Sequence, residues 1–357
     1  MIDNTESVID NTEIQNIDEI IDEISAIISC YKYLPDDVEV NAHVNKWLLQ
    51  FDSDDRRIVA KCTLNILSKV YLPESFYIEQ VNYIVRNYVK KNIITNSSFL
   101  DLQAGSESQK EINKMILDET LRYHNVHIPI NDFGKDKFFY FDDVVFSGGR
   151  IYQDMRYWII NIAPNGCELF IIVMVCHSYA LYDLGRQINN FIRSSGKSIR
   201  FDIIVSSMII ENKVVNRNSS SVFWLDQASL AIPTYIRNPY NFTTEVPRTR
   251  SDIDYVSSAI SGDKLFSLFD ADRSRFERIL LEKGFYIISQ CTSPDDKMKP
   301  LGYKIFNGAG FGGTVFTYRN CPNNTPLVYW WGNPKAMSTS PLSKWYPLMQ
   351  RKPNGTN

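Results

Sequence analysis

Hydrophobic residues recur at helical spacing near the start of the chain. Apolar positions 14, 17, 21, 24 and 28 lie three or four residues apart, which predicts an amphipathic helix ending before the Pro-Asp-Asp turn at 34–37. Two further helices are predicted, one capped by Asp52 or Ser53 and one opened by Pro73. Residues 14–95 are therefore predicted to form a helical N-terminal region.

The pattern changes at residue 96 to short apolar runs separated by helical stretches. The runs that begin at residues 98, 138, 168 and 199 have the length and composition of buried strands. A strand, a helix and a second strand in this order are typical of parallel pairing with right-handed crossovers. We therefore predict an α/β core over residues 96–210.

The remainder of the chain is less regular. Residues 211–265 are rich in Asn, Ser, Thr and Pro, and are predicted to form an insertion that covers the carboxyl edge of the sheet. An amphipathic helix is predicted over 273–283, and a short strand over 285–288. Glycine-rich turns beside aromatic residues then predict that residues 266–357 form a β-rich C-terminal cap that completes the domain.

Residues 138–150, with the sequence FFYFDDVVFSGGR, concentrate the polar groups of the predicted core. Four large apolar residues precede Asp142 and Asp143, so the strand is predicted to deliver two carboxylates at the carboxyl end, where open α/β sheets bind ligands. Without a ligand role, this would be a buried strand that ends in a solvated Asp-Asp turn.

A predicted phosphate site follows the two acids. Ser147, Gly148, Gly149 and Arg150 open a predicted helix, where a hydroxyl and two glycines let backbone N–H groups approach an anion. The spacing suits a ribose 5-phosphate, with its diol on the two acids and its phosphate at residues 147–150.

The same stretch resembles the phosphoribosyl-diphosphate (PRPP) signature of type I phosphoribosyltransferases, which ends in Thr-Gly-Gly-Thr. Ser147 replaces the first threonine, and Arg150 replaces the last, which removes a hydroxyl and adds a positive charge. The resemblance implies a phosphoribosyltransferase-like (PRTase-like) parallel sheet flanked by helices. It also implies that Mg²⁺ acts together with Asp142 and Asp143.

The resemblance further implies a pyrophosphate loop after the first strand of the core. Ala104, Gly105 and Ser106 are small residues before a predicted helix and would offer free N–H groups, although a plain strand-to-helix turn fits equally well. At the end of the strand that begins at residue 168, His177 and Tyr179 are candidates to contact a nucleobase or another acceptor. A histidine satisfied at the rim of the sheet is the alternative.

Composition and charge narrow the class of protein. The chain has 357 residues, of which 44% are hydrophobic and 22% charged, as in ordinary globular proteins. The net charge is −3, but residues 1–31 contain eight acids and no Lys or Arg, so the remaining residues carry a net +5. We expect the acidic, low-complexity start at 1–13 to be disordered or loosely helical.

The sequence indicates neither a membrane-spanning segment nor a set of metal ligands. The longest apolar run, residues 169–176, is too short to span a bilayer, and the acidic start does not resemble a secretory signal. Six cysteines show no Cys-x-x-Cys spacing, and four histidines are scattered. We therefore expect a reduced, cytoplasmic protein with no membrane partner.

Several segments together resemble the phosphoribosyltransferase-like proteins of bacterial conflict systems. They are the central motif, NCPNNTPL at 320–327, WWG at 330–332 and WYPLMQR at 345–351, and the resemblance extends over residues 40–352. It implies an antiphage role, including in retrons, where a reverse transcriptase with its RNA–DNA hybrid or another defence-module protein would be the partner.

Two functions are predicted from these observations. In the first, the protein is an effector or regulator that binds PRPP or a related ribose phosphate with Mg²⁺ and transfers it to a nucleobase, nucleotide or nucleic acid. In the second, it is a non-catalytic module that senses a nucleotide or nucleic acid and gates a partner toxin or reverse transcriptase complex.

Overall fold

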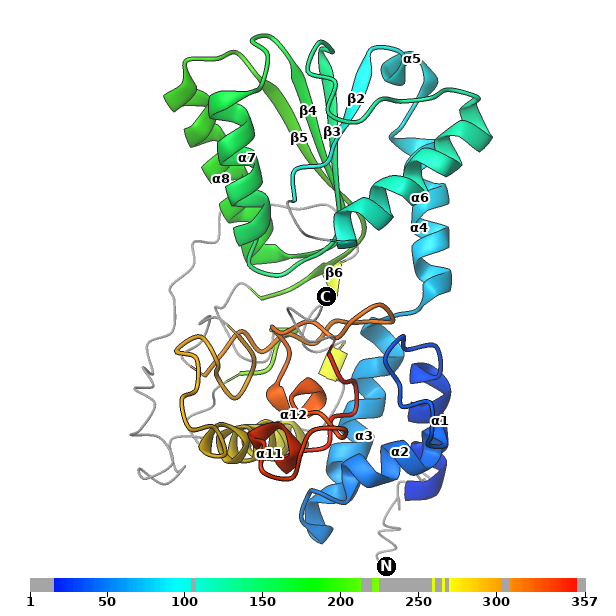
Figure 1. The fold of residues 1–357 in the computed structure, drawn as a ribbon, viewed down its shortest axis with the longest axis vertical. Coiled ribbons are helices and arrows are strands. Elements are labelled where there is room, and N and C mark those ends of the chain that lie inside the picture. Colours follow the sequence, from blue (N-terminus) through cyan, green and yellow to red (C-terminus); the bar gives the residue numbers. More distant parts are fainter. Residues whose placement is uncertain are drawn as a thin grey trace, which may run out of the picture.

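The structure is a computed structural model that describes residues 16–103, 107–212, 220–224, 259–260, 265–266, 270–303 and 309–351. Figure 1 shows a sheet with its helices in the upper part of the molecule and a mainly helical body below it. The predicted acidic start at 1–13 lies outside the described residues, as does most of the predicted insertion at 211–265. Within the described ranges, no helix is both long and apolar enough to cross a bilayer.

The N-terminal region is helical, as the spacing predicts. It contains α1 (Ile17–Ile28), α2 (Val40–Leu48), α3 (Ser53–Val70), α4 (Glu74–Asn87) and the short α5 (Lys91–Ile94). Asn16 and Glu19 form a capping box that starts α1. The sequence pattern gave no prediction for α2, a nine-residue helix whose Trp47 is fully buried.

Five parallel strands form the main sheet in the order β2-β3-β4-β5-β6. They are β2 (Ser97–Leu100), β3 (Lys137–Val145), β4 (Glu168–His177), β5 (Arg200–Ile210) and β6 (Ala259–Ile260). Helices α6 (Glu107–His124), α7 (Gly149–Asn161) and α8 (Ser178–Ser195) connect the first four strands. The predicted α/β class, with a parallel sheet flanked by helices, is confirmed.

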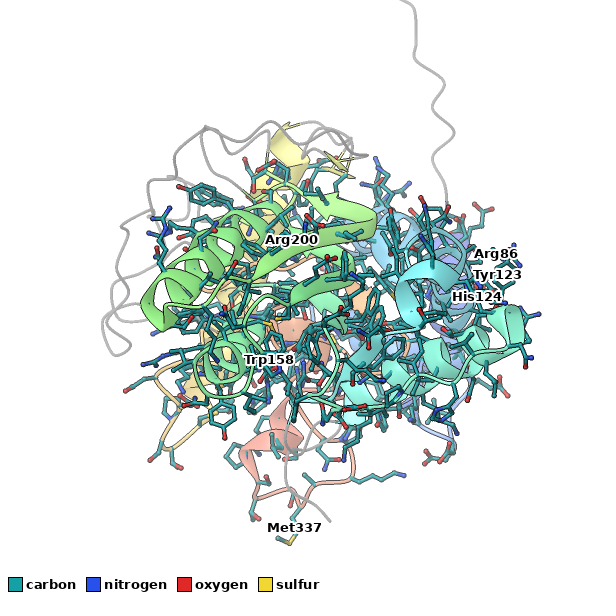
Figure 2. The ribbon with its side chains drawn as sticks, turned by 90° about the horizontal axis from the view of Figure 1, so that it is seen from above. Arg86, Tyr123, His124, Trp158, Arg200 and Met337 are labelled. Atoms are coloured by element: carbon teal, nitrogen blue, oxygen red, sulfur yellow. The ribbon has the colours of Figure 1, made fainter. Side chains whose placement is uncertain are left out.

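The apolar run in β3 supplies both faces of this sheet. Phe139 and Phe141 belong to the cluster that includes α4 and α6, while Phe138 and Tyr140 belong to the cluster that includes α7 and α8. Figure 2 shows Trp158 of α7 on one side of the sheet and Tyr123 at the end of α6 on the other. Burial on both faces explains why the strand is continuously apolar rather than alternating.

The direction of the chain through the sheet reverses at β2. Phe99 of β2 forms a parallel bridge with Ile130 on its outer edge, and its N–H donates to the carbonyl of Pro129 at 2.9 Å. The chain thus moves outward from β2 through α6, returns to the inner side at β3, and continues the other way through α7. Right-handed connections in opposite directions place α6 and α7 on opposite faces. The boundary between β2 and β3 is therefore the topological switch point, where open α/β sheets bind ligands.

The lower body joins the two ends of the described chain. Strand β1 (Tyr71–Leu72) pairs in parallel with β7 (Phe316–Thr317), and α11 (Asp270–Ser289) packs against α3. The ring of Trp47 stacks on Tyr329 of α12 (Leu327–Trp330) at 5.6 Å, and its indole N–H donates to the carbonyl of Val328. Segments from both ends of the sequence thus share one core.

Two predictions for the C-terminal region are wrong. Residues 285–288 continue α11 instead of forming a strand, because Gly284 does not end the helix; it allows Pro300 to pack where a Cβ would lie 2.6 Å from the proline Cβ. The described part of 266–357 contains the helices α11 and α12, the 3₁₀ helix η4 (Pro341–Lys344) and one two-residue strand, β7. It is therefore not rich in β structure. Aromatic residues of this region pack against α2 and α3, where Tyr329 stacks on Trp47 and its hydroxyl lies 3.1 Å from Thr63 Oγ1.

Candidate functional site

The two predicted acids lie at the switch point. Asp142 and Asp143 are inside β3, with Val144 and Val145 still to follow in the strand. Strand β2 ends at Leu100, which is paired with Tyr140, so the acids lie beyond the end of their neighbour on that side. The prediction that they close the strand is therefore wrong by two residues, because β3 continues beside β4 as far as Val145.

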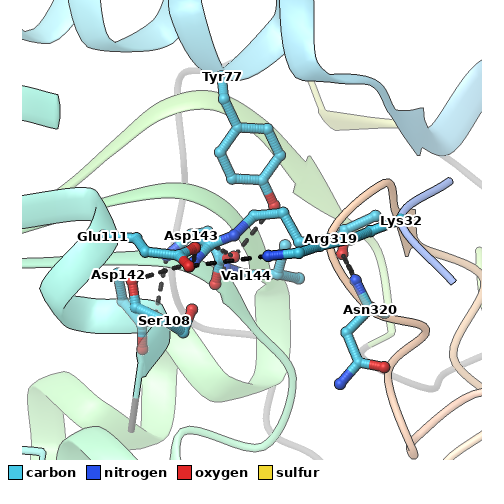
Figure 3. Close-up of polar contacts among 10 residues, drawn as sticks. Lys32, Tyr77, Ser108, Glu111, Asp142, Asp143, Val144, Arg319 and Asn320 are labelled. Atoms are coloured by element: carbon cyan, nitrogen blue, oxygen red, sulfur yellow. Dashed lines mark hydrogen bonds and ion pairs between the residues drawn. The ribbon is translucent and has the colours of Figure 1, made fainter. Parts of the chain in front are cut away.

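Asp143 is held by two side chains from distant parts of the chain. The hydroxyl of Tyr77 in α4 donates to Asp143 Oδ2 at 3.0 Å, and Arg319 Nη1 lies 3.4 Å from the same oxygen. The side chains of Arg319 and Asp143 are only 11% and 16% exposed. Figure 3 shows Tyr77, Asp143 and Arg319 converging from α4, β3 and the C-terminal segment.

Arg319 also reaches the start of α6. Its Nη2 contacts the Glu111 carboxylate and lies 3.4 Å from the carbonyl oxygen of Ser108. Burial lowers the pKa of Arg319, but Asp143, Tyr77 and Glu111 together outweigh it and leave the pKa raised. The positive charge is therefore fixed between β3 and the helix that follows the predicted pyrophosphate loop.

Asp142 has different hydrogen-bond partners from Asp143. Its Oδ1 accepts a hydrogen bond from the backbone N–H of Asp143 at 3.0 Å. Burial, followed by the neighbouring charge of Asp143, raises the pKa of Asp142 well above its usual value. A cation or a hydrogen-bonding ligand beside this carboxylate would offset the cost of ionising it.

Gln109 fixes the chain between β2 and α6. Its Oε1 accepts from the N–H groups of Leu102 and Gln103, at 3.0 and 3.1 Å, and its Nε2 donates to the carbonyl of Phe141 at 3.3 Å. The start of the predicted pyrophosphate loop is thus tied to the open edge of β3. Ala104, Gly105 and Ser106 themselves lie outside the described residues.

The predicted phosphate cradle forms the N-terminus of α7. Gly148 is the N-cap residue in a left-handed conformation, with φ of 71°, and as a glycine it has no side chain to cap the helix. Gly149 is the first helical residue, Ser147 is half-buried, and Arg150 is exposed. The first N–H groups of α7 precede its first intrahelical hydrogen bond, which Tyr152 donates to Gly148 at 2.9 Å, so they have no acceptor within the helix. A helix N-terminus of this kind can attract an anion.

The two acceptor candidates have separate environments. His177 is fully buried; its Nδ1 is 2.9 Å from the Val145 carbonyl oxygen, and its ring contacts Phe146 and Phe311. Burial lowers the pKa of His177 to about 4, so the ring is neutral. Tyr179 is the second residue of α8, and its N–H donates to Asn212 Oδ1 at 2.9 Å. Complete burial of His177 fits a structural role better than contact with an acceptor.

The oxygen donors at the site are of the type that Mg²⁺ prefers, but they are few. Among the described residues, no cluster of three or more His, Cys, Asp or Glu side chains is arranged to hold a metal ion. Mg²⁺ commonly binds through one or two carboxylates together with substrate phosphates. Asp142 and Asp143 fit that pattern if the ligand brings its own phosphates.

Sequence reasoning missed Tyr77, Gln109, Glu111 and Arg319. Tyr77 belongs to the apolar run of the helix opened by Pro73, where nothing in the sequence distinguishes it from a core residue. Gln109 and Glu111 are polar residues of the next long helix, where nothing distinguishes them from surface residues. Arg319 could have been singled out as a candidate site residue, because it is a lone cation in the turn-rich sequence Tyr-Arg-Asn-Cys-Pro at 318–322. Its partners could not be identified without the fold.

Comparison with known proteins agrees with the geometry of the sheet. The family model PRTase-CE matches residues 44–351, which is more than half of the chain and includes β3, α7 and the segment that carries Arg319. No curated protein matches the chain.

Proposed function

Because the chain belongs to the PRTase-CE family, we propose that this phosphoribosyltransferase-like protein binds PRPP or a related ribose phosphate at the switch point. The observation that carries the proposal is the convergence of three kinds of group at one edge of the sheet. They are the carboxylates of Asp142 and Asp143, the N-terminus of α7, and the buried guanidinium of Arg319.

Each group suits one part of such a ligand. The N–H groups at residues 149–151 would bind the 5-phosphate, because helix N-termini attract anions, and exposed Arg150 would add a positive charge. The carboxylates of Asp142 and Asp143 would accept hydrogen bonds from the two ribose hydroxyls. Arg319, beside Ser108 at the start of α6, would attract the pyrophosphate, a charge that the Ala-Gly-Ser loop itself lacks.

In the proposed transfer, an acceptor attacks C1 of the ribose as the bond from C1 to pyrophosphate breaks. The new bond joins C1 to the acceptor, and the acceptor's proton leaves with the pyrophosphate. The residues of this chain would contribute mainly by fixing the sugar and stabilising the charge of the leaving group. Mg²⁺ bound to the ligand phosphates beside Asp142 and Asp143 would neutralise part of that charge.

One observation favours the second candidate function, a sensing module. Asp143 is engaged by Tyr77 and Arg319, and Arg319 lies two residues after β7 of the β1–β7 pair. A ribose diol that competes for Asp143 would loosen this contact between the sheet and the lower body. Ligand binding would then change the surface offered to a partner, such as a toxin, a reverse transcriptase with its RNA–DNA hybrid, or another defence-module protein.

Calorimetry with PRPP and Mg²⁺ tests the shared premise of both functions. We expect binding by the wild-type protein, loss of binding in the Asp142→Asn/Asp143→Asn variant, and unchanged binding in Asp118→Asn, which removes an exposed acid of α6. Equal affinity in the double variant and the wild type would refute the ribose-binding role.

A pyrophosphate-release assay separates the two functions. Nucleobases, nucleotides and RNA are offered as acceptors with PRPP and Mg²⁺, and pyrophosphate is measured. Release that depends on both PRPP and one acceptor class supports transfer. Tight binding of PRPP without release supports sensing.

A further inference from the structure

A cavity of about 400 Å³ lies between two segments that are far apart in the sequence. Residues 32–38, which connect α1 to α2, form one side, and residues 334–335 and 346–351 contribute to the other. Ligand pockets in proteins have volumes of roughly 300–1,000 Å³. Asp142, Asp143 and the start of α7 do not line this cavity, so it is distinct from the candidate ribose site.

Basic side chains outnumber acidic ones around the cavity. Four cationic residues line it, Lys32, Lys46, Lys335 and Arg351, against the two acids Asp36 and Asp37. Lys32 has an ion pair with Glu111, at 4.0 Å. Within the described ranges, no ion pair engages the other three cations. The lining of the cavity therefore carries a net positive charge, with four cations against two acids.

Burial of the Arg351 cation in this lining destabilises the folded protein. Its guanidinium lies 5.3 Å from the centre of the Trp330 ring, and burial lowers its pKa below the ordinary value for arginine. A cation removed from water without a carboxylate partner destabilises the folded state. An anion in the cavity would offset that cost and form charge-assisted hydrogen bonds with the guanidinium.

An aromatic and apolar wall faces these cations. Tyr346 lies under Lys46, whose Nζ is 4.3 Å from the ring centre, and its hydroxyl is 2.7 Å from His43 Nδ1, which fixes the ring. Tyr33, Val38 and Pro334 add apolar surface. This wall suits a flat organic group, which can stack on an aromatic ring or on Pro and Val.

We propose that this cavity is a second ligand site, which takes a nucleoside polyphosphate. Lys46, Lys335 and Arg351 bind the phosphates, and the base lies against the part of the wall formed by Tyr33, Val38 and Pro334. The site reaches the candidate ribose site through Lys32, because Glu111 contacts both Lys32 and Arg319.

Calorimetry without Mg²⁺ tests the proposal with three probes: ATP, inorganic tripolyphosphate and adenosine. We expect ATP to bind, tripolyphosphate to bind more weakly, and adenosine not to bind. Equal affinity for ATP and tripolyphosphate would mean that the base does not contact the aromatic wall, and would contradict a nucleoside ligand. No binding of either polyphosphate at millimolar concentration would overturn the site.

Variants place the binding in the cavity. Lys46→Gln/Lys335→Gln changes two exposed side chains and should weaken ATP binding roughly tenfold or more, since hydrogen bonds to charged groups are lost. Lys61→Gln, an exposed lysine of α3 outside the cavity, should leave it unchanged. Asp142→Asn should also retain ATP binding, which separates failure of this proposal from failure of the ribose site. Equal ATP affinity in the double-lysine variant and the wild type overturns the proposal.

Photo-crosslinking gives a second readout that does not depend on a variant. The wild-type protein is irradiated with azido-ATP, digested, and the labelled peptide identified. Label within residues 32–46 or 334–351 supports the site. Label confined to the neighbourhood of Asp142 or α7 overturns it, because ATP would then occupy the ribose site.

Discussion

The two halves of the candidate ribose site are held together by different forces. The half at α7 is formed by neighbouring residues, with Gly148 in a left-handed conformation beside Leu184. The half at Asp143 is formed by Tyr77, Glu111 and Arg319, which come from α4, α6 and the segment after β7. One half depends on backbone geometry, and the other depends on opposite charges brought together by the fold.

This difference suits the two halves to different tasks: one would hold a ligand in place, and the other would link ligand binding to contacts elsewhere in the molecule. A helix N-terminus with a tight glycine turn can bind a phosphate without any change elsewhere in the molecule. A ligand that binds Asp143 would compete with contacts that connect the sheet to the lower body. The first half is suited to anchor a ligand, and the second is suited to report that the ligand has bound.

Arg319→Met should cause the largest loss of stability. It removes the charge from a largely buried pair while keeping side-chain bulk, and such a loss typically costs about 3–5 kcal/mol because the partner charge stays buried. Urea unfolding followed by circular dichroism measures it. Adding Asp143→Asn to Arg319→Met should recover part of the loss, since the unpaired carboxylate is then removed.

Arg278→Ala is the matched control for that comparison. Its ion pair with Glu282 is about half exposed on both sides, so screening by water and salt should make its loss nearly neutral. If both arginine variants lose equal stability, the network at Asp143 is not energetically special.

Gly148→Ala should cost about 1–3 kcal/mol in the free energy of unfolding. A left-handed conformation is strained with a side chain, and the new Cβ would lie 2.9 Å from Leu184 Cγ. Gly185→Ala is the control, because Gly185 is inside α8 with open space around it and should gain roughly 0.5–1 kcal/mol. Thermal unfolding of both variants is the measurement, and a loss in both would mean that the turn is not the cause.

Asp142→Asn should change the pH dependence of stability. Asp142 binds its proton more tightly in the folded chain than in the unfolded chain, so the wild-type protein loses stability as the pH rises from 3.8 towards the raised pKa. The variant lacks this loss and should therefore become more stable than the wild type with rising pH, whereas the two should differ little in acid. Urea unfolding at a series of pH values tests this, and a difference independent of pH would contradict it.

Arg150→Ala should change stability least, by under about 0.5 kcal/mol, because the side chain is exposed. It should nevertheless weaken PRPP binding by roughly 1.5–3 kcal/mol if the guanidinium reaches the 5-phosphate. Calorimetry on a variant with unchanged melting temperature tests the claim. Unchanged affinity would mean that Arg150 does not bind the 5-phosphate and that only the backbone of α7 does.

The elements that the sequence predicted well are those defined by neighbouring residues. The apolar run at 138–141 is buried on both faces as expected, and the helical spacing of Ile151, Met155 and Trp158 places all three in the core. Glycine was misleading at 284, because there it makes room for Pro300 and does not end a helix. Local spacing contains no information on which distant segment approaches.

The network at Asp143 could not be predicted for that reason. Its partners Tyr77 and Arg319 are brought together by the pairing of β1 with β7 and by the packing of α4 on α6, both of which depend on the completed fold. The raised pKa of Asp142 likewise follows from burial that the Asp-Asp dipeptide alone does not indicate.

The pairing of β1 with β7 has a consequence for the timing of assembly in a cell. Tyr71 pairs with Phe316, about 245 residues further along the chain. At a synthesis rate of about 5–20 residues per second, roughly 12–50 s separate the emergence of the two strands. During that interval the core of α1 and α3 lacks its C-terminal cover, and Asp143 lacks Arg319. A nascent chain can therefore form its phosphate cradle early, but it acquires the charge network only near the end of translation.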